Sequence, residues 1–231
     1  MGFGVFSFIL MFFFTMIFPI LLLIFLLPKI YAKNAKQSEN KAGQVFGAEN
    51  VSIDDLGKSI FGFSLEKVLI IKSGTFVFRV IQHLGSKNNP PHTTFFIEED
   101  VGLPFTLTKE GFVERIGKKI SLMSELELGR KDLDDYFFIA VSDATRGKDF
   151  FFQSKMTEVL QRLMKLADFE KMAAIKREVG KNNKLSDYFP FSTSSVITLR
   201  LYGSLDRHDP EVLKEAASLL SLCAEVLRRF R

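Results

Sequence analysis

The feature that most constrains this chain is an unbroken apolar run near its N-terminus, at residues 3–27. The run contains no charged side chain and consists mainly of Phe, Leu, Ile and Met. As a helix, its roughly 25 residues would span about 37 Å, more than the roughly 30 Å of a bilayer core. The sequence therefore predicts one transmembrane helix in residues 1–28. In lipid, Thr15 is expected to return its hydroxyl to a backbone carbonyl, and Pro19 is tolerated in such helices.

Three other interpretations of this run fit less well. A cleaved signal peptide needs basic residues before a shorter apolar stretch, and small residues at the cleavage site. No Lys or Arg precedes this run, and the positions around Ala32 and Ala35 lack the small-residue pattern. A helix buried in a protein core is rarely apolar all round. N-myristoylation after Gly2 is excluded because Phe6 stands where Ser or Thr is required.

The predicted orientation follows from the lysines on the C-terminal side of the run. Lys29, Lys33, Lys36 and Lys41 lie there, whereas no Lys or Arg precedes it. The positive-inside rule then places the C-terminal part of the chain in the cytoplasm. The expected localisation is a single-pass membrane protein, in the inner membrane if the host is bacterial, with the lipid bilayer as its first partner.

After the apolar run the composition changes to that of a basic linker and a globular domain. Residues 29–48 are polar and carry the flanking lysines, and residues 49–231 are charge-rich and predict a soluble α+β domain. The net charge of +4 is too small for a nucleic-acid footprint, which needs a concentrated basic face. A single cysteine, Cys223, excludes an intrachain disulfide and a cysteine-based metal cluster.

The pattern of apolar residues predicts a mostly antiparallel sheet covered by two amphipathic helices. Ser52 resembles a helix cap for a short turn towards Ile60. A hairpin is expected with its turn at Ser73-Gly74. The predicted strands are residues 67–72, 75–83, 93–98, 102–108, 136–142 (a central strand), 172–179 and 195–202; residues 113–120 are a helix or a turn. The predicted helices are residues 153–167 and a C-terminal helix capped by Asp209, with Pro210 in its first turn.

One stretch of the domain resembles a known pattern. Residues 129–138, GRKDLDDYFF, precede the strand IAVSD, an amphipathic helix, two strands and a final helix. This layout, over residues 93–231, resembles uncharacterised bacterial families of membrane-anchored α+β domains with a Gly-Asp-x-x-Phe-Asp-like signature. Arg130 and Lys131 depart from the Asp of that signature, and Leu133 replaces a Phe. The resemblance implies an anchored α+β domain and no assigned chemistry.

Two acidic groups are the weak candidates for a metal or acid–base site. The first is Asp206, His208 and Asp209, and the second is Asp132, Asp134 and Asp135. The alternative is that Asp209 caps the last helix and that the other residues decorate solvated turns. A third acidic run, Glu98 to Asp100, follows a predicted strand and has the same alternative explanation.

No catalytic, cofactor-binding or metal-binding motif is recognised in the sequence. Cys223 lies among apolar residues of the final helix, where cysteine usually acts as a small core residue. No glycine-rich phosphate-binding loop is present. No cofactor is therefore expected.

Three functions are compatible with these observations. The first is a membrane-tethered, non-enzymatic interaction or scaffold domain that binds another protein or itself. The second is a membrane-associated enzyme with a carboxylate-lined site made from the loops near Asp132 to Asp135 and Asp206 to Asp209. The third, nucleic-acid binding, requires a shared basic face and is disfavoured by the modest charge; its residues would be Arg79, Lys118, Lys119, Lys155 and Arg162.

Overall fold

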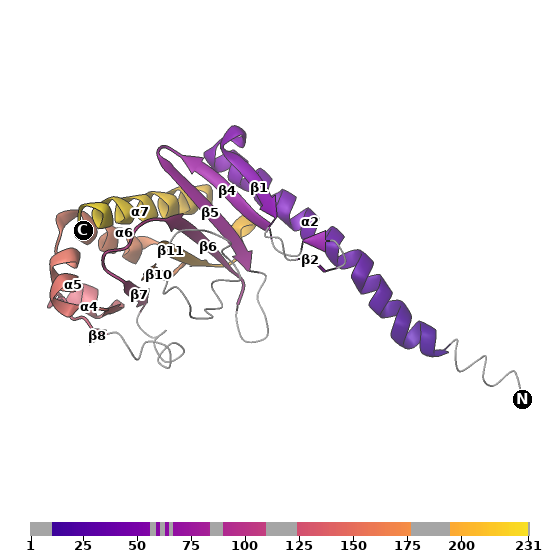
Figure 1. The fold of residues 1–231 in the computed structure, drawn as a ribbon, viewed down its shortest axis with the longest axis horizontal. Coiled ribbons are helices and arrows are strands. Elements are labelled where there is room, and N and C mark those ends of the chain that lie inside the picture. The colour runs from indigo at the N-terminus through magenta and orange to yellow at the C-terminus, as the bar shows by residue number, and fades with distance from the viewer. Residues whose placement is uncertain are drawn as a thin grey trace, which may run out of the picture.

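The computed structural model describes residues 11–55, 59–60, 63–64, 67–83, 90–109, 124–176 and 195–230. The fold is α+β: an antiparallel sheet carries helices on one face, and a long N-terminal helix projects away from this body (Figure 1). The nine strands of the main sheet are β1 (Val51–Asp55), β4 (Lys67–Ser73), β5 (Phe76–His83), β6 (His92–Glu98), β7 (Phe105–Lys109), β8 (Ser124–Glu125), β9 (Phe137–Val141), β10 (Phe169–Lys176) and β11 (Ser195–Tyr202).

The sheet has the order β1-β4-β5-β6-β11-β10-β7-β9-β8, and every neighbouring pair is antiparallel. β6 pairs with β11, which lies about a hundred residues further along the chain, so long-range pairing joins the two halves of the sheet. A separate pair of short strands, β2 (Ser59–Ile60) and β3 (Phe63–Ser64), forms a second small sheet.

The conformation of the β4–β5 hairpin follows directly from its local sequence. Ser73 pairs with Phe76 across a two-residue turn, and Gly74 adopts φ +58°, a conformation that glycine tolerates best. Along β5 the side chains of Phe76, Phe78 and Val80 are buried in the core, while Val77 and Arg79 point to the other face. The hairpin predicted from the sequence is confirmed, with its turn one residue later, at Gly74 and Thr75.

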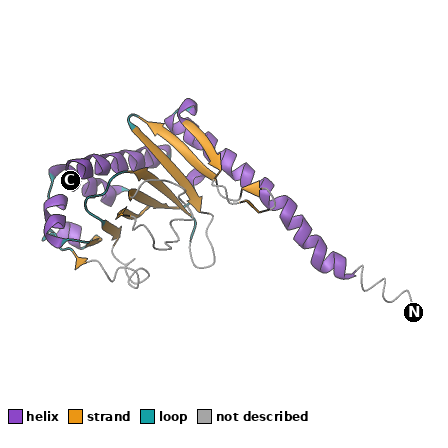
Figure 2. Cartoon of the chain, viewed as in Figure 1, coloured by secondary structure: helices purple, strands orange, loops and turns teal. Residues whose placement is uncertain are grey.

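The core lies between the sheet and the helices on one of its faces (Figure 2). α6 (Ser154–Lys165) contributes Met156, Val159, Leu160 and Leu163, spaced at three and four residues. α7 (Pro210–Arg229) contacts α6, β6 and β11. The remaining helical elements are α4 (Lys131–Asp134), α5 (Ala144–Phe151) and the 3₁₀ turns η2 (Ala48–Asn50) and η4 (Leu205–Arg207). The two amphipathic helices expected to cover the sheet are both present.

The N-terminal helix has two parts with opposite surroundings. The π-helical turn η1 (Phe13–Ile17) leads into α2 (Phe18–Phe46), where Pro19 has no N–H to donate. The first part projects from the body (Figure 1). The second part packs against it: Ala42 is fully buried, and α2 contacts β1, β4, α7 and η4. As expected, the Thr15 hydroxyl donates to a backbone carbonyl, that of Met11, at 2.7 Å.

The predicted transmembrane helix is wrong. Within residues 11–230, as far as they are described, no helix combines the length and the apolar character needed to cross a bilayer. The reason is the composition of α2: only its first third is apolar, and Lys29, Lys33, Lys36 and Lys41 follow within the same helix. The single-pass topology, membrane localisation and cytoplasmic orientation inferred from that helix are corrected with it.

The predicted linker is also wrong. Residues 29–46 continue α2, which ends at Gly47 with φ +90°. Lys29, Lys33 and Lys36 are exposed on this helix, and Lys41 is half-buried. The residues after Lys33 favoured a linker by their polarity, but Ser38 and Ala42 bury one side of the helix against the body. Tertiary packing therefore decides the conformation here.

Other expectations have mixed outcomes. Ser52 lies in strand β1 and does not cap a helical turn, because residues 51–55 pair with β4. β9 is next to the end of the sheet and is not central; its apolar run reflects burial, with Phe137 and Ile139 in the core and Ala140 also buried. The predicted strands 93–98 and 195–202 are confirmed by β6 and β11. The strand predicted at 172–179 begins earlier, at Phe169, and the predicted segment 113–120 lies outside the described residues.

An aromatic cluster at one end of the core provides a stability test. Phe105 is fully buried, with its ring 5.6 Å from that of Phe150 and 5.4 Å from that of Phe151, centroid to centroid. We expect Phe105→Ala to lower the free energy of unfolding by about 3–5 kcal/mol, because it leaves a cavity. The measurement is urea-induced unfolding of the full chain. Phe152→Ala, at an exposed neighbour, is the control; equal losses in both variants would contradict this packing.

Candidate functional site

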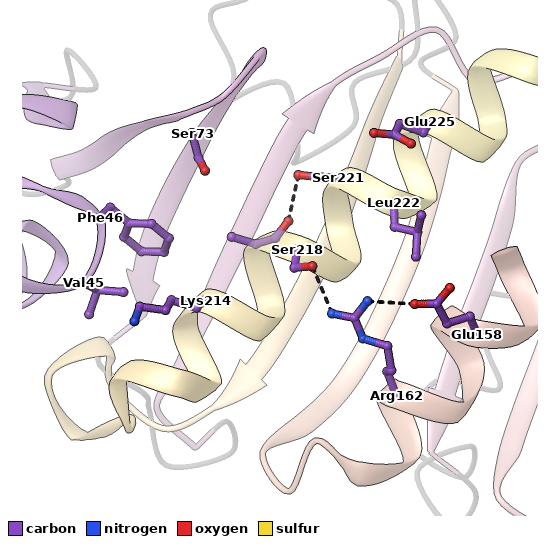
Figure 3. A pocket seen from close by; sticks show the side chains of 11 residues that line it. Val45, Phe46, Ser73, Glu158, Arg162, Lys214, Ser218, Ser221, Leu222 and Glu225 are labelled. Carbon is purple, nitrogen blue, oxygen red and sulfur yellow. Dashed lines mark hydrogen bonds and ion pairs between the residues drawn. The ribbon is translucent and has the colours of Figure 1, made fainter.

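A cleft of about 610 Å³ lies on the helical side of the molecule (Figure 3). Its walls come from three parts of the chain that are distant in sequence. Val45 and Phe46 come from the end of α2, Ser73 from the tip of the β4–β5 hairpin, and the remaining residues from α6 and α7. The α6 and α7 residues are Glu158, Arg162, Lys214, Ala217, Ser218, Ser221, Leu222 and Glu225.

The guanidinium of Arg162 holds the charged side of this cleft together. Its Nε and Nη2 donate to the two carboxylate oxygens of Glu215, both at 2.8 Å, and Nη1 donates to Glu158 at 3.1 Å. Nη2 also donates to Ser218 Oγ (Figure 3). The hydrogen bonds with Glu215 raise the pKa of Arg162 and lower that of Glu215. This geometry is the bidentate fork that guanidinium and carboxylate favour.

The other charged residues of the cleft are paired as well. Lys214 Nζ lies 3.1 Å from Glu211, and Glu225 lies 3.4 Å from Lys155 Nζ. Since each charge that lines the cleft has a partner of opposite sign, the cleft offers apolar side chains and hydroxyls rather than an uncompensated charge. Its described lining contains neither a histidine nor a cysteine. The ionisable groups of the lining, among them Glu158, Lys214 and Glu225, are thus held in ion pairs.

Two of the three histidines of the chain meet on the sheet. His83 ends β5 and His92 begins β6, where they are register partners, and their rings stack with centroids 4.3 Å apart. Arg200, on the neighbouring strand β11, pairs with the buried carboxylate of Glu170 at 3.2 Å. The pKa of His83 is lowered to about 4, mainly by burial and then by the charges of His92 and Arg200. Burial, then Arg200, also lowers the pKa of His92.

The third histidine, His208, is buried beside the same end of the sheet. Its side chain is 2% exposed, and Nδ1 lies 2.8 Å from Oδ2 of Asp168. An ionised carboxylate only accepts, so Nδ1 donates. Nε2 is buried and has no hydrogen-bond partner within the described part of the chain. Gly203, with φ +98°, lies against this ring, where a Cβ would come within 3.5 Å of Cε1. His208 does not line the cleft.

The residues proposed around His208 do not converge on a site. Asp209 is the N-cap of α7, and its Oδ1 accepts from the backbone N–H of Glu211 at 2.9 Å. Asp206 is exposed in η4. The predicted cap is confirmed, but the expectation that the neighbours of Asp209 are solvated is wrong for His208.

The second acidic group serves local structure in and around α4. Oδ1 of Asp134 accepts from the backbone N–H of Leu128 at 2.8 Å. Asp132 pairs with Arg130 at 2.8 Å, and this hydrogen bond lowers its pKa. Asp135 is the exposed C-cap of the same short helix. None of these aspartates lines the cleft.

Two residues of the acidic run at the end of β6 form ion pairs with arginines. Glu98 pairs with Arg79, and Glu99 lies 2.6 Å from Arg228 of α7. No group of three or more His, Cys, Asp or Glu side chains within the described ranges is arranged to hold a metal ion. Cys223 is fully buried in α7, which raises the pKa of its thiol to about 12. Its predicted position in the core is confirmed.

The stacked histidines could have been found from the sequence, whereas the other contacts could not. His83 and His92 flank the connection between two successive predicted strands, so antiparallel pairing would bring them together. Asp168 is 40 residues from His208, and no local pattern links the two. The cleft depends on α2, which was not expected to pack on this domain.

A scan against protein-family models and a search of curated proteins both find no match to this chain. The resemblance of residues 93–231 to anchored bacterial families is not tested by these searches and stays a prediction.

The helix cap gives a test that separates the two aspartates of the η4 loop. We expect Asp209→Ala to lower the free energy of unfolding by about 1 kcal/mol, because the N–H of Glu211 loses its acceptor. Asp206→Ala, three residues earlier, should change it by less than about 0.5 kcal/mol. Urea unfolding of both variants measures the difference. A stabilisation by calcium that Asp209→Ala abolishes would contradict the assignment as a cap.

The histidine pair gives a pH test. Because the pKa of His83 is lowered from 6.5 to about 4 on folding, the unfolded chain binds more protons between these values. This contribution to stability is fully present above pH 6.5 and is lost as the pH falls towards 4. We expect the melting temperature of His83→Gln to fall less steeply than that of the unmodified chain between pH 7 and 4. The carboxylates of the two proteins contribute equally to the pH dependence. Parallel curves of melting temperature against pH would therefore contradict the lowered pKa of His83.

Proposed function

We propose that this protein is a non-enzymatic binding domain that holds a partner protein through the projecting part of its N-terminal helix. The term projecting segment is used below for residues 11–30. The observation that carries the proposal is the concentration of exposed apolar side chains on this segment.

Of the 15 large apolar side chains that are exposed in the described structure, 13 lie on the projecting segment. Their exposed fractions range from 39% at Ile17 to 67% at Met11 and Phe25. The other two, Val77 and Phe152, are isolated positions on the folded body. Scattered apolar residues are normal on protein surfaces, but a large contiguous patch marks an interaction site.

The way α2 is held supports a binding role. Further along the helix, Ser38 donates to Gln82 at 2.6 Å, and Ala42 is fully buried in the core. Gly47 then ends the helix, with its N–H donating to the carbonyl of Gly43 at 2.9 Å. The exposed apolar side chains are thus presented on a helix with a packed base, which reduces the entropy lost on binding.

The alternative, an enzyme with a carboxylate-lined site, receives less support. Asp132 and Asp134 are used by local contacts around α4, and Asp209 caps α7. Among the described residues, neither the acidic group at Asp132 to Asp135 nor the one at Asp206 to Asp209 lines the cleft. The third possibility needed one basic face, but Arg79 pairs with Glu98 on the sheet face opposite the core, whereas Arg162 and Lys155 pair on the helical side. Lys118 and Lys119 lie outside the described residues.

A site-specific photo-crosslinker tests the proposal. We expect a photoreactive phenylalanine analogue at Phe25 to yield covalent adducts with protein after irradiation of cells that express the full chain. The same analogue at Phe152, which is 54% exposed on the body, is the matched control and should yield far fewer. Adducts with protein are read as shifted bands and identified by mass spectrometry. Irradiation that yields only adducts with molecules other than protein would overturn the proposal.

A further inference from the structure

We infer that the partner of the projecting segment is a second copy of this chain, and that the segments of two or more copies pack side by side in antiparallel fashion. This inference rests on the proposed function and names its partner. It draws on the distribution of the exposed side chains, the area they present and the position of the lysines.

The apolar side chains point in all directions around the projecting segment. At about 100° per residue, the exposed α2 positions Phe18, Leu26, Ile20 and Leu21 point at about 0°, 80°, 200° and 300° around the helix axis. A groove on a globular partner would cover one side of such a helix only. Helices from further copies, each equally apolar, can cover the remaining sides, as in helical bundles.

The area presented is sufficient for a stable interface between copies. The 13 exposed apolar side chains include five phenylalanines, of which each can bury 150–250 Å². With about half of each side chain exposed, the segment offers on the order of 1,000 Å² per copy, against about 800 Å² per partner in a standard interface. Phe14 already contacts Phe13 and Phe18 at ring-centroid distances of 5.8 and 5.9 Å, which forms an aromatic ridge for such packing.

The lysines determine the direction of packing. Residues 11–28 carry no charge, whereas Lys29, Lys33 and Lys36 are exposed where the segment joins the body. Parallel copies would bring these ammonium groups together, and would also place two folded bodies at the same end. In an antiparallel pair the lysines of the two copies are separated by about 30 Å, beyond the screening length of about 8 Å at physiological salt. Charge and space therefore both favour the antiparallel arrangement.

Disulfide formation between engineered cysteines tests the partner and its direction. Two differently tagged full-length chains are co-expressed, one with Met11→Cys and the other with Ile30→Cys. The native Cys223 is fully buried, with its pKa raised to about 12, and should not form a disulfide under these conditions. In an antiparallel pair the two new cysteines lie side by side, and mild oxidation should give a disulfide-linked dimer that carries both tags. Two copies with Met11→Cys should not link, because their Cα atoms would be about 28 Å apart, against a limit of about 7 Å.

Two control pairs complete the test. Val77→Cys with Phe152→Cys reports random collision, because both are exposed apolar positions of the body. Polar substitution of Phe14 and Phe25 by Gln within the Met11→Cys and Ile30→Cys chains should reduce the cross-linked fraction to the level of that collision control. The folded body should keep its melting temperature, since both phenylalanines are exposed.

The outcomes separate this inference from the proposed function. If the cysteines do not link above the collision control, while the photo-crosslinker at Phe25 captures a different protein, the inference is wrong and the binding role stands. Linkage of two Met11→Cys copies would also overturn the antiparallel inference. If the photo-crosslinker captures no protein, both are wrong.

Discussion

The packing of α2 against the folded body is the interaction on which the rest of the structure depends. The buried side of residues 38–46 connects the projecting segment to the sheet, to α7 and to η4. Val45 and Phe46 from the same region form one wall of the cleft. A single helix therefore carries both the exposed apolar surface and part of the core. The exposed apolar part of the helix meets the part that packs on the body near Lys29, where the uncharged apolar run has ended.

The main sheet provides the platform for this helix because side chains of its strands share one core with the helices. Phe78 on β5, Phe95 on β6 and Leu199 on β11 lie in the same core, and α7 contacts two of these three strands. Burial of these side chains is the dominant favourable contribution to such a fold. The pairing of β6 with β11 joins the β4–β5 hairpin to the C-terminal half, so the domain is stabilised as one unit.

Local sequence patterns predicted the body of the fold better than its connections. The hairpin at Gly74, the amphipathic helix predicted at residues 153–167 and the cap at Asp209 each depend on interactions within a few residues, and each is confirmed. Two expectations failed where distant contacts decide. Ser52 pairs within the sheet although its local pattern resembles a helix cap, and residues after Lys33 are helical because Ala42 reaches the core. Similarly, the contact between Asp168 and His208 joins residues 40 positions apart, and no local sequence pattern predicts it.

The apolar run shows why hydropathy alone did not decide the role of the N-terminus. The composition of the run predicts a helix that ends at Pro28, but the helix continues to Phe46 and becomes part of the body. A helix that passes from an apolar, exposed part to a packed, polar part without a break transmits its orientation to the domain. Partners that bind the projecting segment would therefore position the whole body, and the direction in which copies associate would set the distance between their clefts.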